Sequence, residues 1–379
     1  MQAIQDLIKQ GEGIGLEFKS SLLNSESLAK EFVAFSNSYG GTLLIGVQDD
    51  GEIEESITID EEWVQNIARQ NIIPPIQVLT DTVSMGTKKV LKITIPKGSD
   101  KPYQTLSGKF YIRAGSTNRQ ASKEELGRLF QESGLIHFDT IAVQNTSILD
   151  LDVDKLTKYW NDCYQIAFGE LSDGEKIRIL RNSDIIHNHQ KEEKISLAGM
   201  LIFGKTPQKH LRHTSIKFAV FSGLDRTTDL LDKKEITGTL DELVDKALGL
   251  TLTYVANPSS GLSGGKRIET PAVSQKTIRE LIVNAIAHRD YSILNQFISI
   301  YKFMDRIEIT SPGKLPNTLT LEKIRFGNSA PRNIALVRFL DNLRYIDVLG
   351  RGIPSIIQEL QDRVHFQEEG QLFKVTVFL

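Results

Sequence analysis

The sequence predicts a mixed α/β protein built from more than one domain. Its 379 residues exceed the roughly 100–200 residues of a single domain, and helix-like and strand-like patterns alternate along most of the chain. With 40% hydrophobic and 25% charged residues, the composition is that of a globular protein. We expect an N-terminal α/β domain over residues 1–133, a helical connector over residues 134–194 and a C-terminal α/β domain over residues 195–379.

The N-terminal pattern begins with a helix over Ser25–Tyr39, which Ser25 or Ser27 caps and Gly40-Gly41 ends. Leu28, Phe32 and Phe35 share one face of it. A short apolar strand, Thr42–Val47, follows and runs into a turn. The remaining elements expected here are helices near Glu61–Arg69 and Lys123–Ser133 and strands around Ile76–Leu79, Lys89–Ile95 and Lys109–Arg113.

The rest of the chain also alternates. Residues 151–270 predict helices over Val153–Ala167, Ile195–Phe203 and Leu240–Leu250, a strand over Ile216–Phe221 and a mobile loop over Ser259–Lys266. The last stretch predicts a helix around residues 278–288, a hairpin of Ile298–Phe303 and Ile307–Thr310, a helix over Ser355–Leu360 and a final strand, KVTVFL.

Several protein classes are excluded. No run of about 18 apolar residues exists, so we expect no membrane span, and the N-terminus has no signal-peptide pattern. Cys163 is the only cysteine, which rules out a disulfide scaffold and a cysteine-based zinc site and fits the cytoplasm.

Charge is unevenly distributed along a chain whose net charge is −3. Residues 49–62 hold eight acids and no base, whereas residues 86–128 hold ten bases and three acids. The basic stretch fits a phosphate backbone, and a solvated surface explains it equally well. The candidate nucleic-acid contacts are Lys88, Lys89, Lys101, Lys109, Arg113 and Arg119.

Carboxylates gather around two glycine-containing segments, GEGIGLEFKS and GGTLLIGVQDDG. If the two strands are neighbours, Glu12, Glu17 and Asp49 converge beside Lys19. Such a cluster suits Mg²⁺ or Mn²⁺, which would activate a water, with the lysine near the developing negative charge. Solvated carboxylates near turns are the alternative, and spacing alone favours that alternative.

GLEFKS, EFVAFSNSYGGTLLIGVQDDG and IRAGSTNRQAS, in this order, resemble the Schlafen AlbA-type nucleic-acid-binding domain over about residues 10–130. The resemblance implies contact with DNA or RNA. In the Schlafen nucleases a carboxylate triad cuts structured RNA such as tRNA, and by position that triad corresponds to Glu12, Glu17 and Asp49. Many proteins with this domain are described only as nucleic-acid binders.

The segment IRELIVNAIAHRDYS places Glu280, Asn284 and His288 on one helix face, at positions i, i+4 and i+8. An asparagine can ligate Mg²⁺ while the glutamate orients a water. Gly350 and Gly352 precede a predicted helix, where free backbone N–H groups receive phosphate oxygens. Either motif alone fits ordinary structure, and the pair favours a nucleotide site.

ELIVNAIAHRDYS, DRIEITSPGKLP, RNIALV and GRGIPSI together resemble the C-terminal region of RecG-like regulators, which is similar to the ATPase fold shared by gyrase, histidine kinases and MutL. The resemblance implies a two-layer α/β sandwich that binds ATP. Glu280 would be the catalytic base, Asn284 the Mg²⁺ ligand, and Gly350 and Gly352 the phosphate-loop glycines. The strand ending in Ile309–Gly313 lacks the aspartate that reads adenine in those ATPases, and no helicase P-loop occurs.

Three functions follow. The favoured one is a nucleotide-responsive nucleic-acid-binding regulator or defence-type factor. The second is a metal-dependent endoribonuclease with a regulatory C-terminal domain, and the third is a scaffold without enzymatic activity. The resemblance also allows a homodimer, because relatives with both folds often self-associate.

Overall fold

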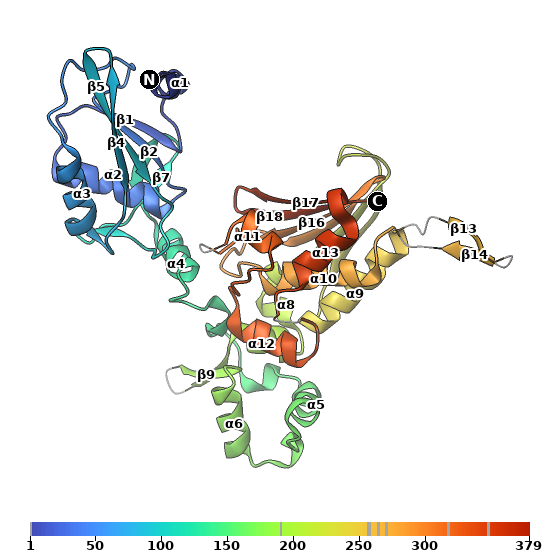
Figure 1. The fold of residues 1–379 in the computed structure, drawn as a ribbon. Helices are drawn as coiled ribbons and strands as arrows, with labels where there is room; N and C mark the ends of the chain where they lie inside the picture. Colours follow the sequence, from blue (N-terminus) through green and yellow to red (C-terminus); the bar gives the residue numbers. More distant parts are fainter. Residues whose placement is uncertain are drawn as a thin grey trace. The chain divides into compact units, whose positions relative to one another are not determined.

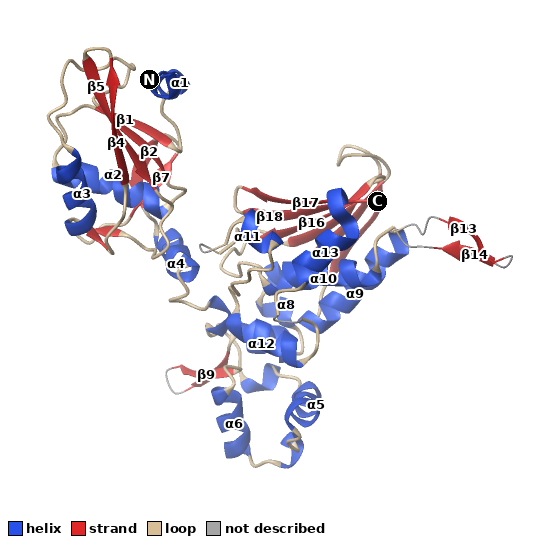
Figure 2. Cartoon of the chain, in the orientation of Figure 1, coloured by secondary structure: helices blue, strands red, loops and turns tan. Residues whose placement is uncertain are grey.

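The computed structural model describes residues 2–189, 192–255, 259–263, 266–269, 272–316, 319–346 and 349–379. The chain divides into two compact units, Met1–Ile136 and His137–Leu379 (Figure 1). Both units mix helices with sheets, as the sequence predicts (Figure 2). No helix among the described residues has the length and apolar character needed to cross a membrane.

A four-stranded sheet forms the centre of the first unit. Its strands, in spatial order, are β1 (Leu16–Lys19), β2 (Gly41–Ile45), β5 (Lys88–Ile95) and β4 (Leu79–Met85). β1 and β2 run parallel, with Glu17 opposite Leu43, and the other two pairs are antiparallel. The two carboxylate-bearing segments are therefore neighbours in the sheet.

The two faces of this sheet are covered separately. Phe18 and Leu44 pack with Ile4 from α1 (Gln2–Gln10), whereas Leu43 and Ile45 pack against α2 and α3. This alternation is what a strand buried on both faces requires. The remaining elements of the unit are α2 (Ser25–Asn37), α3 (Glu61–Gln70), β3 (Ile72–Ile73), β6 (Gln104–Thr105), β7 (Tyr111–Ala114), β8 (Thr117–Gln120) and α4 (Lys123–Glu132).

Two local expectations differ from the structure here. The cap of α2 is Asn24, whose Oδ1 accepts a hydrogen bond from the Ser27 N–H at 2.8 Å, and neither Ser25 nor Ser27 takes this role. The strand expected at Ile76–Leu79 instead begins at Leu79, because Pro74 and Pro75 are followed by an extended segment without strand pairing.

A six-stranded sheet forms the centre of the second unit. In spatial order its strands are β12 (Leu230–Ile236), β11 (Ile216–Phe221), β15 (Ile298–Lys302), β16 (Arg306–Pro312), β18 (Leu372–Phe378) and β17 (Val364–Glu369). β11 and β15 are parallel, and the other neighbours are antiparallel. Figure 1 shows α9 (Leu240–Tyr254), α10 (Gln275–Ala287) and α13 (Gly352–Leu360) on one side of this sheet. Sheet and helices make the expected two layers.

The remaining helices and strands of this unit lie between these elements and before them. They are α5 (Val153–Tyr164), α6 (Asp173–Asn182), β9 (Ile186–His189), β10 (Glu192–Ile195), α7 (Leu197–Phe203), α8 (Pro207–His210), β13 (Ser259–Ser263), β14 (Lys266–Glu269), α11 (Leu321–Arg325) and α12 (Ile334–Asn342). The segment expected to be a mobile loop thus contains β13 and the start of β14, which pair antiparallel, and its residues 264 and 265 lie outside the described residues.

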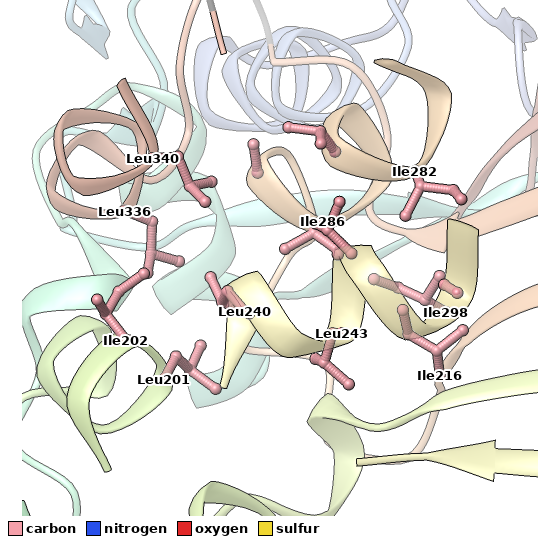
Figure 3. Packing of buried hydrophobic residues seen from close by; sticks show 14 of the residues in the cluster. Leu201, Ile202, Ile216, Leu240, Leu243, Ile282, Ile286, Ile298, Leu336 and Leu340 are labelled. Atoms are coloured by element: carbon pink, nitrogen blue, oxygen red, sulfur yellow. The ribbon is translucent and has the colours of Figure 1, made fainter. Parts of the chain in front are cut away.

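Most of the segment 134–194, expected to be a connector, belongs to the second unit from His137 onward and contributes to its hydrophobic core. Leu156 and Tyr159 of α5 belong to the same buried cluster as Ile282 and Ile286 of α10. Figure 3 shows α10 residues packed near Leu240, Leu336 and other apolar side chains of this cluster.

Asp139 anchors the start of the second unit to α12. It is fully buried, and its Oδ2 accepts a hydrogen bond from the Leu336 N–H at 3.0 Å. The residue before α12, Asn333, makes no side-chain cap. The first turn of α12 is therefore capped by a carboxylate almost 200 residues earlier in the chain.

Candidate functional site

A cavity of about 390 Å³ lies in the second unit between α10, the end of β16 and the start of α13. Apolar side chains make much of its wall, including Leu281, Ile309 and Phe373. The five nucleotide-site residues predicted from the sequence all line it: Glu280, Asn284, His288, Gly350 and Gly352. Two segments some 60 residues apart in the sequence thus contribute to one concave site, as expected of a small-molecule pocket.

α10 presents the polar part of the site. Ser274 caps the helix by accepting a hydrogen bond from the Thr277 N–H, and Leu281, Ile282 and Ile286 are buried in the core. The opposite face carries Glu280 and Asn284, whose Nδ2 donates to Glu280 Oε1 at 3.1 Å. This bond uses the amide nitrogen, so the amide oxygen of Asn284 is the atom with the chemistry of a metal ligand.

The glycines allow backbone segments to approach one another closely. A Cβ atom on Gly352 would lie 1.9 Å from Glu280 Oε1. Gly350 has φ +70° and a Cβ there would lie 2.3 Å from the Gly327 carbonyl oxygen. At Gly350 a larger residue would collide with backbone in a conformation that favours glycine, whereas at Gly352 it would displace the end of the Glu280 side chain. This edge of the site is therefore bare backbone.

A buried ion pair supports the other edge, and the sequence analysis missed it. Asp290 Oδ2 and Arg332 NH1 lie 2.8 Å apart with both side chains 5% exposed, and Arg332 NH2 also donates to the Lys314 carbonyl oxygen. Gly313, with φ +113°, packs directly on Asp290. The sequence signal for this contact lay in the motifs HRDYS, SPGK and PRN, which contain Asp290, Gly313 with Lys314, and Arg332, respectively.

His288 is held neutral within the cavity wall. Enclosure by protein lowers its pKa to about 4, and the positive charge of Arg332 adds to the effect. The buried His213 behaves in the same way, with desolvation first and Arg289 second lowering its pKa to about 4. Neither imidazole carries charge at neutral pH.

The segment Ile309–Gly313, where the sequence lacks an aspartate, presents a serine to the cavity. Ser311 lines the cavity, and its Oγ donates to the Ala285 carbonyl oxygen at 2.7 Å. Its lone pairs are then the groups left to a ligand, so it can accept a hydrogen bond but brings no charge. Asp305 lies in the turn between β15 and β16, paired with Arg306 at 2.9 Å.

In the first unit, the predicted carboxylates have separate partners. Glu17 is 5% exposed and pairs with Arg113 NH1 at 2.7 Å as well as with Lys19. Glu12 Oε1 accepts from the Phe18 N–H at 2.8 Å, and Asp49 lies exposed beyond β2. Within the described part of the chain, no group of three or more acidic, histidine or cysteine side chains is placed to hold a metal ion.

The carboxylate that joins Glu17 in the structure is Glu31 of α2, which the sequence analysis did not single out. Glu31 is 4% exposed and lies 3.8 Å from Arg113 NH1. Burial, and next the negative charge of Glu17, raise the pKa of Glu31. Burial alone would lower the pKa of Lys19, but its hydrogen bond to Glu17 and the nearby carboxylates raise it. Arg113 also stacks on the Phe35 ring, 4.5 Å from its centroid.

The six candidate nucleic-acid contacts differ in what they already bind. Lys101 is buried and pairs with Glu132 at 3.0 Å, and Lys88 donates to the Ile53 carbonyl oxygen at 2.7 Å. Arg119 binds both oxygens of Glu125, whose pKa this hydrogen bonding lowers to about 2.

The two remaining exposed candidates are Lys89 and Lys109. Arg113, as described, is buried against Glu17.

Comparison with known families confirms both resemblances. Residues 12–122 match the family described as Schlafen, AlbA_2, and residues 295–377 match the family described as "Putative ATP-dependent DNA helicase recG C-terminal". The chain therefore pairs a Schlafen AlbA_2 domain with a RecG-type, ATPase-like C-terminal domain. This pairing indicates a nucleic-acid-related protein with a nucleotide-binding type of fold.

The solved structures that are similar to the chain include the following two. The crystal structure of the DIP2311 protein from Corynebacterium diphtheriae is 21% identical and covers 100% of this chain and 79% of its own, with a TM-score of 0.49. The solution NMR structure of the N-terminal domain of a RecG-related protein from Nitrosomonas europaea is 23% identical, covers 32% of this chain and 95% of its own, and has a TM-score of 0.24. No curated protein matches the chain.

The buried histidines predict a loss of stability in mild acid. An unfolded histidine takes up a proton near pH 6.5, whereas folded His213 does so only near pH 4, so stability is full above pH 6.5 and falls as the pH drops toward 4. The loss at pH 4 amounts to about 3 kcal/mol for His213. Thermal unfolding between pH 7 and 4.5 measures it. His213→Gln should flatten the pH dependence and the exposed control His189→Gln should not; equal slopes in both variants would contradict the assignment.

Removing the buried guanidinium should destabilise the first unit. Arg113→Met removes the buried cation beside Glu31 and leaves Glu17 paired with Lys19 alone, which costs about 3–5 kcal/mol. Urea unfolding followed by circular dichroism measures the change. Arg69→Met, at an exposed position of α3, is the matched control, and unfolding midpoints that agree between the two variants would show that the ion pair carries little stability.

Proposed function

We propose that this pairing of a Schlafen AlbA_2 domain with a RecG-type C-terminal domain is a nucleotide-responsive nucleic-acid-binding protein. In this proposal the second unit binds ATP with Mg²⁺ and the first unit contacts DNA or RNA. The observation that carries it is the cavity that Glu280, Asn284, His288, Gly350 and Gly352 line together. Residues with unrelated structural roles would not be expected to line the same cavity.

The residues of the cavity fit a Mg²⁺–nucleotide. Asn284 would hold the metal through its amide oxygen, and Glu280, one helical turn earlier, would orient a water. Bound Mg²⁺ neutralises phosphate charge and polarises the phosphoryl group. Lys314 lines the cavity and adds positive charge to the wall.

The phosphate end would lie at the start of α13. This nine-residue helix begins at Gly352, and its first turn has no side-chain cap, so backbone N–H groups and the helix dipole are available to an anion. Gly350 and Gly352 bring bare backbone to this edge of the cavity, close to Gly327 and to the Glu280 carboxylate. The mainly apolar wall formed by Leu281, Ile309 and Phe373 suits the base.

Ser311 makes base selectivity weaker than in the related ATPases. A neutral hydroxyl that can only accept distinguishes adenine from guanine less than a carboxylate does. We therefore expect ATP and GTP to bind with similar affinities.

Nucleic-acid contact is assigned to the first unit. Lys89 and Lys109 are exposed and suit phosphate contacts, whose strength falls steeply with salt. Regulation would arise through thermodynamic linkage. If nucleotide binding changes the affinity for nucleic acid by some factor, nucleic-acid binding changes the affinity for the nucleotide by the same factor.

Nucleotide binding predicts a thermal shift that depends on Asn284. Mg²⁺-ATP at 100 times its Kd should stabilise the protein by about 2.7 kcal/mol. Asn284→Ala should abolish the shift, and Asn161→Ala, at an exposed position of α5, should keep it. Calorimetry without heat for the wild-type protein, together with an unchanged melting temperature, would refute the nucleotide site and favour a scaffold role.

A metal-dependent nuclease is the second candidate. What favours it is that Glu12, Glu17 and Lys19 lie on one short segment and that the Glu12 carboxylate contacts the backbone next to Glu17, at Phe18. It is less favoured than binding because Glu17 is already engaged by Arg113 and Lys19.

Glu17→Gln separates cleavage from binding. A nuclease should cut tRNA or single-stranded RNA with Mn²⁺, lose the cuts in EDTA and in Glu17→Gln, and still shift the same RNA on a gel. Glu62→Gln, at an exposed position of α3, is the control. Substrates that stay intact under all conditions would leave nucleic-acid binding as the function of this unit.

A further inference from the structure

Two loops on either side of α11 form much of one wall of the nucleotide cavity. Residues 313–316 follow β16, residues 327–329 precede α12, and all of them line the cavity. Lys314 is the only lysine or arginine among the described residues that line it. The position of the first loop relative to α10 therefore decides where the wall carries positive charge.

Arg332 and Asp290 hold the two loops together. Arg332 NH1 lies 2.8 Å from Asp290 Oδ2, and Arg332 NH2 donates to the Lys314 carbonyl oxygen. The Asp290 N–H in turn donates to the Pro312 carbonyl oxygen at 2.7 Å. A Cβ on Gly313 would lie 2.7 Å from the Asp290 Cβ. One buried ion pair thus joins the start of the first loop, the end of the second loop and the turn after α10.

The end of the second loop is also fixed to the last turn of α10. Asn333 is fully buried, and its Nδ2 donates to the carbonyl oxygens of Ala287 at 2.9 Å and Arg289 at 2.8 Å. Desolvation first and the charge of Arg332 second lower the pKa of His288 to about 4, which places Arg332 beside this part of the cavity wall.

The length of α10 separates the ion pair from the phosphate end of the cavity. A Cβ on Gly352 would collide with the Glu280 carboxylate, so the start of α13 lies beside Glu280. The eight residues from Glu280 to His288 rise by about 12 Å along the helix axis, and Asp290 follows them. Because the proposed function places the phosphates at the start of α13, Lys314 belongs to the opposite end, where the base would lie.

We propose that Arg332 and Asp290 are positioning residues of the nucleotide cavity, and that the lysine they place, Lys314, contacts the base of the nucleotide. A lysine ammonium donates to acceptors such as N7, which adenine and guanine share, so this contact does not distinguish ATP from GTP. The inference rests on the proposed function and adds to it the groups that bind the base end of the ligand.

Three ligands separate the two ends of the cavity. ATP, GTP and inorganic triphosphate are each used to displace a fluorescent ATP analogue from the full-length protein, with Mg²⁺ at 150 mM salt. Lys314→Gln should weaken ATP and GTP about tenfold, the loss expected for one hydrogen bond from a charged donor. Inorganic triphosphate should keep its affinity, because salt screens a charge about 12 Å away. Arg325→Gln, at an exposed position of α11, is the control.

Arg332→Lys tests the positioning role. The lysine keeps a cation beside Asp290, but it lacks the planar fork that bonds Asp290 and the Lys314 carbonyl oxygen together. We expect weaker ATP and GTP with unchanged triphosphate, as in Lys314→Gln. The double variant should bind no more weakly than Arg332→Lys alone, because the two residues act through one contact.

Two further variants separate this role from folding. Arg306→Lys alters an arginine paired with Asp305 and Glu308, outside the lining of the cavity, and should leave all three affinities unchanged. Asp290→Asn keeps an oxygen acceptor for Arg332 and repeats the test with a smaller disturbance of the fold. Melting temperatures measured in parallel report the loss of stability in each variant.

Three outcomes would overturn the inference and leave the proposed function standing. The first is equal weakening of all three ligands in Lys314→Gln, which would place the lysine at the phosphates. The second is equal weakening of all three in Arg332→Lys with a lower melting temperature, which would show a purely structural role. The third is wild-type affinity in both variants. A wild-type protein that binds none of the ligands would refute the proposed function together with this inference.

Discussion

The arrangement of the second unit depends on the hydrogen bonds that the fully buried Arg289 guanidinium donates to backbone carbonyl oxygens. This guanidinium donates to the carbonyl oxygens of Asp290, His213, Ile293 and Gln296, at 2.7–3.2 Å. These carbonyls belong to the turn after α10 and to the segment before β11, and without a donor each would be a buried unsatisfied acceptor. Arg289 thereby fixes where α10 ends, and with it the positions of Asn284 and His288.

Both units place buried arginines beside their candidate site, one in the first unit and two in the second, and these arginines act differently. Arg113 neutralises carboxylates that burial would otherwise force to take up protons, whereas Arg289 mainly satisfies backbone carbonyls and Arg332 joins Asp290 to the Lys314 backbone. Buried charges of this kind add little net stability because desolvation is costly. These buried arginines instead favour one arrangement of the loops, because any other arrangement of the loops would leave a buried charge or a buried carbonyl group without a partner.

The sequence identified more of the residues that line the cavity of the second unit than of the charged cluster around Glu17, and the reason is physical. Glu280, Asn284 and His288 lie on one helix, where spacing alone determines that they share a face. Gly350 and Gly352 carry a signal because their backbone needs positive φ or close approach. Glu31 and Arg113 lack such a local signal: Glu31 reads as an ordinary helix residue, and Arg113 meets Glu17 across 96 positions of sequence. Contacts of that range follow from tertiary packing, which periodicity does not encode.

The capping of α12 by Asp139 connects the first residues of the second unit to its cavity. The buried Asp139 carboxylate is bonded to the first turn of α12, and the same helix contributes Val337 to the cavity wall. One helix therefore joins the beginning of this unit to the residues around Glu280 and Asn284.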